Sequence, residues 1–525
     1  MSNKSELLRR RTFAIISHPD AGKTTLTEKL LLFGGAIQIA GAVKARKASR
    51  HVTSDFMEIE RQRGISVATS VMGFDYKGYK INLLDTPGHQ DFCEDTYRTL
   101  TAVDSVIMVI DSTKGVESQT YKLLEVCRMQ KIPVLTFINK LDREGKEPID
   151  LLDEIEEKLG IPVCPLSWPI GKGKAFKGVY SIYEKKLVLF KPHQKQSGED
   201  TLEFTDLDAT HLGPHIGSDA ADTLLYDLEL VEGVYPAFDN ELYLAGEMTP
   251  VMFGSALNNF GVRELLDCFI QEAPSPRPRH TDKRDVLPTE NHFSGFIFKI
   301  HANMDPKHRD RIAFLRICSG QFERGKRYLQ VRTTKPFRSA NPTAFMAQSK
   351  EVVEVAYPGD IIGLHDTGNL IIGDTLTDGE TFQFKGIPSF SPEIFKTIVN
   401  LDPLKTKQLQ KGISQLCEEG ISQLFTRSYD QQKIVGVGGE LQFDVIQFRL
   451  EHEYGAKCRF DPLPFMKACW IIGSTNTDLQ AFVSRHKMQV ATDKDGRYVF
   501  LAETQWSLER EIKENPGITF AFTSE

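Results

Sequence analysis

Apolar residues form a run at 12–16, and an amphipathic run follows at 26–32 after a short polar stretch. The first run predicts a buried strand, and the second predicts a helix with one apolar face. Another apolar run at 103–111 predicts a further strand. The run at 132–138 is nearly continuous, which is typical of parallel strands covered on both faces. The first part of the chain is therefore predicted to be an α/β domain.

Alternating patterns occupy other parts of the chain. Residues 65–76 and 79–84 alternate apolar and polar positions around a Lys-Gly pair, which predicts a β-hairpin. Short alternating strands separated by Gly, Pro and Asp turns recur over 293–378 and predict a small β-barrel. A linker rich in Pro, Arg and His at 273–280 ends the first domain before this barrel.

Beyond Pro388 the pattern predicts strands and helices in the order β-α-β-β-α-β, which is the layout of a ferredoxin-like α+β domain. Its two helices are expected at 404–419 and 440–454. Residues 465–525 are expected to add strand-like runs and one short helix near 506–514. We detect no internal repeat in the sequence.

Composition limits the choice of function. The chain has 525 residues, 40% apolar and 26% charged, so it is too long for one core and several domains are predicted. The net charge of −7 argues against nucleic-acid binding by the whole surface but leaves room for local basic patches. The eight cysteines contain no C-x-x-C pair, which argues against a zinc site or a disulfide framework. No apolar run reaches the roughly 18 residues of a membrane span, so we predict a cytoplasmic protein with no membrane partner.

The polar stretch after the first strand reads S-H-P-D-A-G-K-T-T and joins the strand to a helix, which is the setting of a phosphate-binding loop. Backbone N–H groups of such a loop point at phosphate oxygens. Lys23 is expected to reach the outer phosphates and the Thr24 hydroxyl to hold Mg²⁺. Ser17 stands where the usual pattern has glycine. The residues predicted to contact the nucleotide here are Ser17, His18, Pro19, Asp20, Ala21, Gly22, Lys23, Thr24 and Thr25. Taken alone, the stretch could be a plain surface turn.

Residues 33–64 show no clear apolar period, so they are predicted to be a mobile loop or disordered. The following Ser66 is expected to complete the Mg²⁺ shell only when a γ-phosphate is present, which would be an order–disorder switch. On its own, this charged run would be read as a solvated face.

The second strand of the predicted hairpin delivers a D-T-P-G-H sequence to its carboxyl end, where ligands bind in α/β sheets. Asp85 is expected to hold Mg²⁺ through water, Gly88 to sense the γ-phosphate with its N–H, and His89 to orient the attacking water. The residues predicted to line the site here are Asp85, Thr86, Pro87, Gly88 and His89.

The strand at 132–138 leads into N-K-L-D, that is Asn139, Lys140, Leu141 and Asp142. The Asp142 carboxylate can accept from N1–H and from the exocyclic amine of guanine, whereas adenine offers an acceptor at N1 and no amine at C2. The motif therefore selects GTP over ATP. The last base-binding loop is predicted at Ser255, Ala256 and Leu257, where a backbone N–H would meet the guanine O6.

Asn139 and Ser255 are 116 residues apart (255 minus 139), which is about three times the length of one helix and one strand. An insertion is therefore predicted at about 160–250. Its Gly-Lys-rich stretch at 171–178 lacks the G-K-[ST] ending of a phosphate loop and is predicted to be a basic hairpin.

The predicted domains are a GTP-binding domain at 1–278, a β-barrel domain at 290–380 and an α+β domain at 389–525.

With these motifs in place, the whole sequence resembles the translational GTPases. His89 after D-T-P-G, the R-G-I-S at 63–66 and the barrel that follows carry this resemblance. Within that class the chain is similar to the bacterial class II peptide chain release factors, release factor three. The similarity lies in Ser17, the N-K-L-D-R at 139–143, the W-P-I-G at 168–171 with its Lys-rich continuation, the V-G-G-E-L-Q-F-D at 437–444 and an end near 525.

The resemblance implies a fold class: a P-loop GTPase domain with an insertion, then a β-barrel domain, then an α+β ferredoxin-like C-terminal domain. It also implies a monomer that binds GTP or GDP with Mg²⁺, enters the ribosome after peptide release and drives off class I release factors. It assigns Lys23, Thr24, Ser66, Asp85 and His89 the roles argued above, and it adds Asp20 as a residue on the γ-phosphate side.

Two positions depart from the family pattern. Ser66 replaces the usual threonine, and Pro19 replaces a branched aliphatic residue in the apolar gate that it would form with Ile65 beside His89. No arginine finger is evident, so hydrolysis is expected to be slow until ribosomal RNA organises His89.

Two other functions remain open at this point. One is a ribosome-bound GTPase of the elongation or ribosome-protection type, although elongation factor G continues into two further domains. The other is a non-ribosomal P-loop NTPase, such as an ATP-dependent kinase or sulfurylase subunit.

Overall fold

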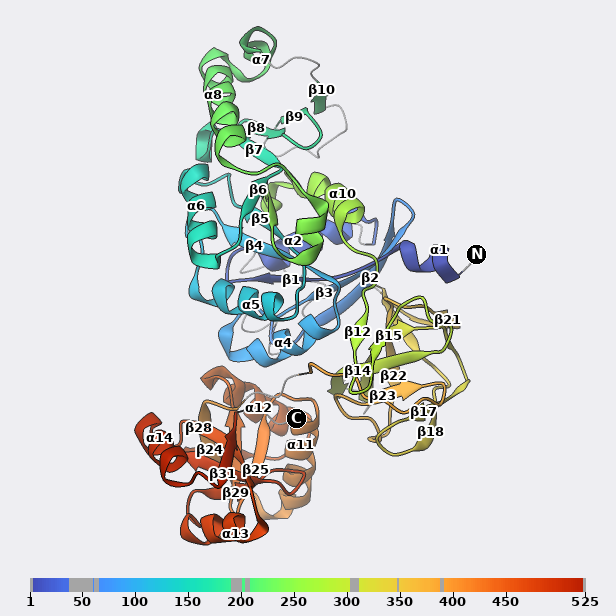
Figure 1. The fold of residues 1–525 in the computed structure, drawn as a ribbon, viewed down its shortest axis with the longest axis vertical. Helices are drawn as coiled ribbons and strands as arrows, with labels where there is room; N and C mark the ends of the chain where they lie inside the picture. The colour runs from blue at the N-terminus through green and yellow to red at the C-terminus, as the bar shows by residue number, and fades with distance from the viewer. Residues whose placement is uncertain are drawn as a thin grey trace.

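The structure is a computed structural model that describes residues 3–36, 60, 66–189, 201–203, 208–302, 311–346, 349–387 and 391–522. Figure 1 shows three lobes: an α/β lobe with its insertion at the far end, a lobe of antiparallel strands, and a C-terminal lobe of strands and helices. This arrangement confirms the predicted fold class. Among the described residues, no helix is long and apolar enough to cross a membrane.

The α/β lobe is built on a sheet whose strands run parallel, except for one edge strand that pairs antiparallel as half of the predicted hairpin. In spatial order the strands are β6 (Val163–Pro165), β11 (Thr249–Phe253), β5 (Val134–Asn139), β4 (Ser105–Asp111), β1 (Arg10–Ser17), β3 (Tyr79–Asp85) and β2 (Ser70–Tyr76). The main helices around it are α2 (Lys23–Phe33), α4 (Cys93–Thr101), α5 (Ser118–Met129), α6 (Pro148–Leu159) and α10 (Val262–Glu272).

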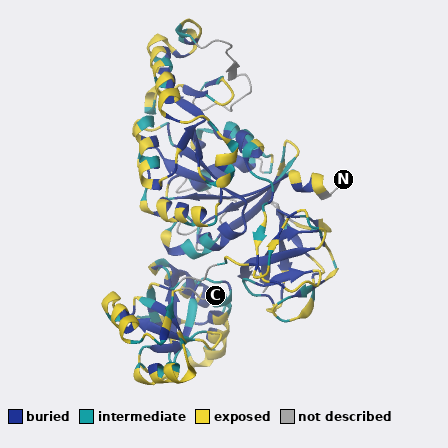
Figure 2. Ribbon diagram, viewed as in Figure 1, coloured by how far each residue is buried: buried dark blue, intermediate teal, exposed yellow. Residues whose placement is uncertain are grey.

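Alternate residues of β1 pack into two separate hydrophobic cores. Phe13 and Ile15 share one core with residues of α2 and α10, whereas Ala14 and Ile16 share the other with residues of α5 and α6. The sheet is therefore covered on both faces, which explains its continuous apolar runs. Figure 2 shows the same layering, with buried strands inside and exposed residues on the outer sides of the helices.

The insertion forms a small layer of its own beyond β6. Its antiparallel sheet consists of β7 (Ser167–Ile170), β8 (Gly178–Ser181), β9 (Lys186–Leu189) and β10 (Thr201–Glu203). Its helices are α7 (Ala209–Ile216), α8 (Ser218–Val234) and α9 (Asn240–Ala245). The stretch at 171–178 connects β7 to β8, which pair antiparallel, and ends on the first residue of β8. It contains a short 3₁₀ turn, η2 (Gly173–Ala175). The prediction of a hairpin there is confirmed.

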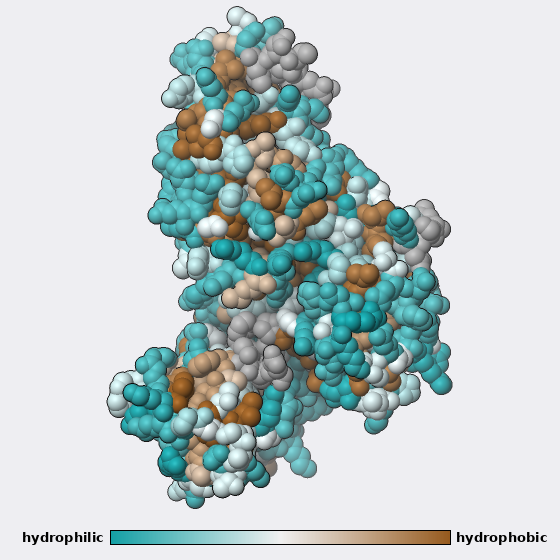
Figure 3. Space-filling model, in the orientation of Figure 1, coloured by the Kyte–Doolittle hydropathy of each residue, from teal (hydrophilic) through white to brown (hydrophobic). Residues whose placement is uncertain are grey.

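On the face shown in Figure 3, hydrophilic residues predominate, and apolar residues gather on the insertion and on the C-terminal lobe. Along α8, Tyr226, Leu230 and Val234 are exposed at intervals of four residues. That spacing puts the three side chains on one side of the helix. One stripe of the insertion is therefore apolar and open to solvent.

The second lobe consists of antiparallel strands around a core of its own. In spatial order its main strands are β18 (Lys335–Arg338), β17 (Arg327–Gln330), β23 (Thr375–Thr377), β14 (Ser294–Ala302), β15 (Arg311–Ser319), β22 (Ile361–His365) and β19 (Thr343–Met346), with β20 (Ser349–Val352) beside β19. At its end, Met346 of β19 pairs with Gly73 of β2, so the strands of two lobes form one continuous sheet.

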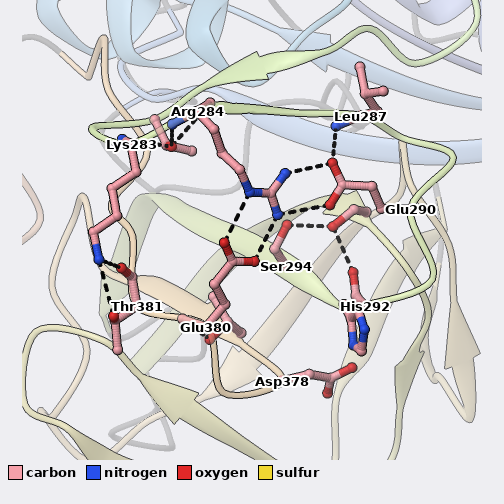
Figure 4. Close-up of polar contacts among 12 residues, drawn as sticks. Lys283, Arg284, Leu287, Glu290, His292, Ser294, Asp378, Glu380 and Thr381 are labelled. Carbon is pink, nitrogen blue, oxygen red and sulfur yellow. Dashed lines mark hydrogen bonds and ion pairs between the residues drawn. The ribbon is translucent and has the colours of Figure 1, made fainter.

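The turn that follows the linker, between β12 (Arg279–His280) and β13 (Asp285–Val286), is held against the second lobe by charged groups (Figure 4). The Arg284 guanidinium donates to both oxygens of Glu290 at 2.8 and 2.9 Å and to both oxygens of Glu380 at 3.0 and 2.7 Å. Lys283 donates to Thr381. These bidentate contacts with Glu380 and Glu290 raise the pKa of Arg284 and fix this turn against the lobe.

The C-terminal lobe contains the predicted β-α-β-β-α-β unit and then repeats it. The first unit is β24 (Ile394–Asn400), α11 (Thr406–Glu418), β25 (Gln423–Arg427), β26 (Lys433–Val437), α12 (Glu440–His452) and β27 (Cys458–Pro462). The second is β28 (Lys467–Gly473), α13 (Asn476–Arg485), β29 (Val490–Thr492), β30 (Tyr498–Ala502), α14 (Gln505–Glu514) and β31 (Ile518–Ala521).

The two units join edge to edge through β25 and β29, and their strands have mirrored orders in one eight-stranded sheet. The prediction of a single short helix after residue 465 was therefore wrong, because α13 is a second one. The fold therefore contains a repeat that is not detectable in the sequence. Each unit needs only its own apolar periodicity, and different side chains supply it in the two cores.

A buried carboxylate ties the first two lobes together. Asp104, in the turn before β4, contacts Arg316 of β15 at 2.5 Å and Arg279 of the linker at 3.0 Å. Asp104→Ala is expected to lower the free energy of unfolding by about 3–5 kcal/mol, because it leaves a buried guanidinium without its partner. Denaturant unfolding of the full chain measures this.

The matched control is Glu323→Ala, which removes an exposed pair with Lys326 at 3.6 Å. Surface pairs of this kind contribute about 0–1 kcal/mol. Equal losses for the two variants would contradict the assignment of Asp104 as the anchor between the lobes.

Candidate nucleotide-binding site

Four loops meet at one edge of the parallel sheet. They follow β1, β3, β5 and β11, and these strands run parallel to one another. Their carboxyl ends therefore lie on the same side of the lobe, which is where α/β sheets bind ligands. The predicted motifs occupy these four loops, so the structure brings them together.

Two residues of the loop after β1 have positive φ angles. Asp20 has φ of +66° and Gly22 has φ of +98°, so both lie in the left-handed region. The hydroxyl of buried Ser17 donates to the carbonyl of His18 at 2.9 Å, and the Ala21 N–H donates to the same carbonyl at 3.3 Å. Ser17 is not among the residues with positive φ, so its backbone does not need the freedom of glycine.

Gly22 lets the loop after β5 approach this turn. A Cβ at Gly22 would lie 2.3 Å from Nδ2 of Asn139, which itself donates to the Ala21 carbonyl at 2.9 Å. Gly22→Ala is therefore expected to lower GDP and GTP affinity by at least about tenfold, because the added Cβ collides with Asn139 and loss of its buried hydrogen bond costs about 1–3 kcal/mol. Equilibrium binding measures the effect.

Gly35→Ala is the control for that variant. Gly35 also has positive φ, at +71°, but nothing lies within 4 Å of the added Cβ. It carries the backbone cost without the collision. Equal affinity losses in both variants would show that the contact with Asn139 is unimportant.

Lys23 and Asp85 form a buried ion pair between the first turn of α2 and the end of β3. Only Oδ1 of Asp85 is used in this pair. Oδ2 is buried and has no hydrogen-bond partner among the described residues. An open carboxylate oxygen suits the water shell of Mg²⁺, which prefers oxygen ligands. Thr24, in the same turn of α2, is only half-buried, so these residues fit the predicted metal.

The loop after β3 lies against the loop after β1. Thr86 is buried and donates to the carbonyl of Ile15 at 2.7 Å, while the Pro87 carbonyl accepts from Thr96 at 3.3 Å. A Cβ at Gly88 would be 3.7 Å from Cα of Pro19. The backbone at Gly88 therefore lies next to the loop after β1, and its contact with a γ-phosphate stays a prediction.

His89 caps the short 3₁₀ helix η1 (Gln90–Phe92) and remains about one-third exposed. Its Nδ1 accepts from the Asp91 backbone N–H at 3.3 Å and lies 3.1 Å from Oδ1 of the same residue. The contacts with Asp91 use one ring nitrogen only. The ring is thus partly exposed rather than enclosed in a core.

Asn139 links the phosphate side to the base side of the site. Its Nδ2 donates to the Ala21 carbonyl at 2.9 Å, and its Oδ1 accepts from the Ala256 N–H at 2.9 Å. Lys140 contacts Oδ2 of Asp111 at 2.6 Å and donates to the Asp20 carbonyl. Leu141 is buried beneath this loop.

Asp142 and the loop after β11 lie side by side. The buried Ser255 hydroxyl donates to Oδ1 of Asp142 at 2.6 Å and accepts from Asn258 at 2.9 Å. The side chain of Leu257 is exposed. The predicted base-binding residues therefore form one group, with Asp142 fixed on one oxygen by Ser255.

Two supporting residues were missed by the sequence reasoning. Burial would raise the pKa of the Asp111 carboxyl, but hydrogen bonds from Lys140 and Thr113 outweigh it and the pKa is lowered. Its position at the end of β4, on the same sheet edge, was a usable signal. Glu117 pairs with Nε2 of His18 at 3.0 Å, while burial lowers the pKa of that histidine. No local pattern indicated this pair.

Most of the predicted switch lies outside the described residues, namely 37–59 and 61–65, and this includes Ile65 of the gate. Ser66 is described and half-buried. Just beyond it, the backbone N–H groups of Val67 and Ala68 donate to Oε1 of buried Glu60 at 2.8 and 3.2 Å. Glu60 therefore anchors the end of this segment.

Comparison with known families decides which class of P-loop protein this is. Residues 8–275, just over half of the chain, match the family model of the elongation factor Tu GTP-binding domain. Residues 292–379 match elongation factor G domain 2, and residues 384–511 match the class II release factor RF3 C-terminal domain. The chain belongs to the translational GTPases of the class II release factor type.

A class II release factor of this type is a GTP-hydrolysing enzyme that uses GTP and GDP with Mg²⁺. A solved crystal structure of a Thermus thermophilus protein has a similar fold, with a TM-score of 0.70 over 89% of this chain and 70% of that chain. The two sequences are 22% identical, so this likeness concerns the fold alone.

Proposed function

We propose that GTP binds across the four loops at the carboxyl edge of the parallel sheet. The main support for this proposal is that Asn139 makes two hydrogen bonds, one to the loop after β1 and one to the loop after β11. In this arrangement Lys23 exchanges Asp85 for the outer phosphates, and Asp142 reads the guanine edge. Thr24, Ser66 and Asp85, the last through water, hold Mg²⁺, which neutralises phosphate charge when bound.

His89 is the residue that we propose to orient the attacking water. Phosphoryl transfer needs positioning and charge stabilisation more than covalent help from the protein. Because about a third of the ring is exposed, an outside surface can reach it. Contact with ribosomal RNA supplies the missing organisation, and hydrolysis by the isolated protein is slow.

We further propose that the GTP-bound protein promotes dissociation of class I release factors from the ribosome after peptide release. The match of the C-terminal lobe to the class II release factor family supports this role. GTP would act by stabilising one conformation of the ribosome-bound protein, since a ligand shifts an equilibrium only through its differential affinity for the two states. The protein acts as a monomer, with domains at 1–278, 290–380 and 389–525.

The test follows a labelled class I release factor on terminating ribosomes. With this protein present, dissociation is expected to be faster with GTP than with GDP. A non-hydrolysable GTP analogue then shows whether hydrolysis acts before or after the class I factor leaves.

Absence of any acceleration, together with intact ribosome-stimulated GTP turnover, would contradict the release-factor role and favour a GTPase of the elongation or ribosome-protection type. Absence of ribosome stimulation as well would contradict both.

A further inference from the structure

Helix α12 of the C-terminal lobe begins against the short helix η1, which directly follows His89. The backbone N–H of Leu441 donates to Oδ2 of buried Asp91 at 2.7 Å, although the two residues are 350 positions apart in the chain. In Figure 1 the C-terminal lobe meets the α/β lobe at this place, near α4 and α12. One carboxylate therefore connects the two lobes.

The other oxygen of Asp91 faces His89. Oδ1 lies 3.1 Å from Nδ1 of the ring, and the backbone N–H of Asp91 reaches the same nitrogen at 3.3 Å. A partner on one ring nitrogen sets the tautomer and the orientation of a histidine. Both contacts with Asp91 hold the ring at Nδ1. When Nδ1 carries the proton it donates to Oδ1 of Asp91, and Nε2 is then the nitrogen that can accept a hydrogen bond from water.

Apolar contacts extend the same junction to the end of the predicted switch. The small cluster that joins the lobes here consists of Val67, Phe92 and Val445, with Leu441 and Phe448 packed against it. Val67 directly follows Ser66, and Phe92 is the last residue of η1. Helix α12 therefore rests on both segments that adjoin the predicted γ-phosphate sensors.

Two adjacent glycines at the start of α12 differ in how they meet Asp91. A Cβ at Gly439 would lie 2.1 Å from Cγ of Asp91, so this close approach requires glycine. A Cβ at Gly438 would meet only the Gln442 side chain at 3.6 Å and the Asp91 carbonyl at 3.8 Å, which are ordinary contacts. Gly439 has an extended backbone with φ of −157°, and Gly438 is not among the glycines with positive φ.

We propose that Asp91 is a positioning residue for His89 and that α12 controls it: ribosome-stimulated hydrolysis requires α12 to be docked on η1. The inference rests on the proposed role of His89. By linkage, any nucleotide state that moves η1 or the segment at Ser66 must also change how strongly α12 docks. The C-terminal lobe would then respond to hydrolysis through Asp91.

The test uses the full chain on ribosomes, with GTP turnover measured at saturating ribosome concentration. Gly439→Ala displaces Asp91, and Asp91→Ala removes its carboxylate without introducing a collision. Both variants are expected to lower kcat by about 10- to 100-fold, the scale of a misplaced catalytic group. The KM for GTP and the affinity for GDP are expected to stay unchanged. Gly438→Ala, the matched control, is expected to retain the kcat of the unmodified protein.

A purely structural effect is separated by a double-mutant comparison. In a His89→Ala background, Gly439→Ala is expected to cause no further loss of turnover, because both substitutions interrupt the same interaction. GDP affinity and thermal unfolding of each variant show whether it has folded. A further loss in that background, or a kcat unchanged in both Gly439→Ala and Asp91→Ala, would overturn the inference.

A different result would contradict the proposed role of His89. If His89→Ala itself keeps ribosome-stimulated turnover, then the role of His89 is wrong and the positioning role of Asp91 falls with it. If His89→Ala is inactive and the two variants at the junction are fully active, only the positioning role is wrong.

Discussion

Replacing His89 with alanine is expected to abolish ribosome-stimulated GTP turnover and to leave nucleotide binding close to normal. The side chain caps η1 and contacts Asp91, and none of its described contacts holds the phosphate loop or the base loops. Loss of a positioned group of this kind lowers rates by about 10²- to 10⁴-fold. Single-turnover hydrolysis on ribosomes, with GTP affinity measured in parallel, gives both quantities.

An exposed histidine provides the control for this variant. His211 of α7 lies in the insertion and pairs only with Asp208 among the charged groups described around it. His211→Ala is expected to turn over GTP like the unmodified protein. Turnover retained in His89→Ala would contradict the catalytic assignment, whatever the result for His211.

Asp142→Asn is expected to change the base preference from guanine to xanthine. The carboxylate accepts from two guanine donors, and each charged hydrogen bond contributes about 1.5–3 kcal/mol. Loss of both corresponds to a GTP affinity about 10²- to 10⁴-fold lower. Xanthine carries an oxygen where guanine carries the amine, so the asparagine amide can donate to it. Competition binding with the two nucleotides measures the ratio.

Ser255→Ala is the control for the base preference. It removes the hydroxyl that holds one oxygen of Asp142 at 2.6 Å but leaves the carboxylate in place. Affinity should fall while guanine stays preferred. An unchanged ratio of GTP to XTP affinity in Asp142→Asn would exclude Asp142 from base recognition.

The residues of the candidate site could be predicted because each motif is local. A strand end, a turn and a helix start fix the direction of nearby groups, and parallel strands bring such ends to one edge. Asn139 was located in this way, but its bridge to Ala21 and Ala256 was not, since it depends on how three loops close on one another.

The contacts that couple the lobes had no local signal. Asp91 and Leu441 meet across 350 residues, and Asp104 meets Arg316 across 212. Only the packed fold brings such pairs together. Lys23 was predicted as a phosphate ligand. Neither motif alone indicated its ion pair with Asp85, because this pair depends on how close the start of α2 lies to the end of β3.

The fold was predictable where periodicity was strong. The first β-α-β-β-α-β unit had apolar faces such as Leu409, Ile413 and Leu416 on one helix. Helix α13 was missed because only Phe482 is fully buried along it, so its apolar face is short. The pairing of β25 with β29, which joins the two units, depends on register between edges and could not be read from either strand.

The most direct test of the account is single-turnover GTP hydrolysis with and without ribosomes that hold a class I release factor after peptide release. The account predicts slow hydrolysis by the free protein, strong acceleration on these ribosomes, and no acceleration for His89→Ala. Equal rates with and without ribosomes would contradict it, because the geometry around His89 would then be sufficient by itself.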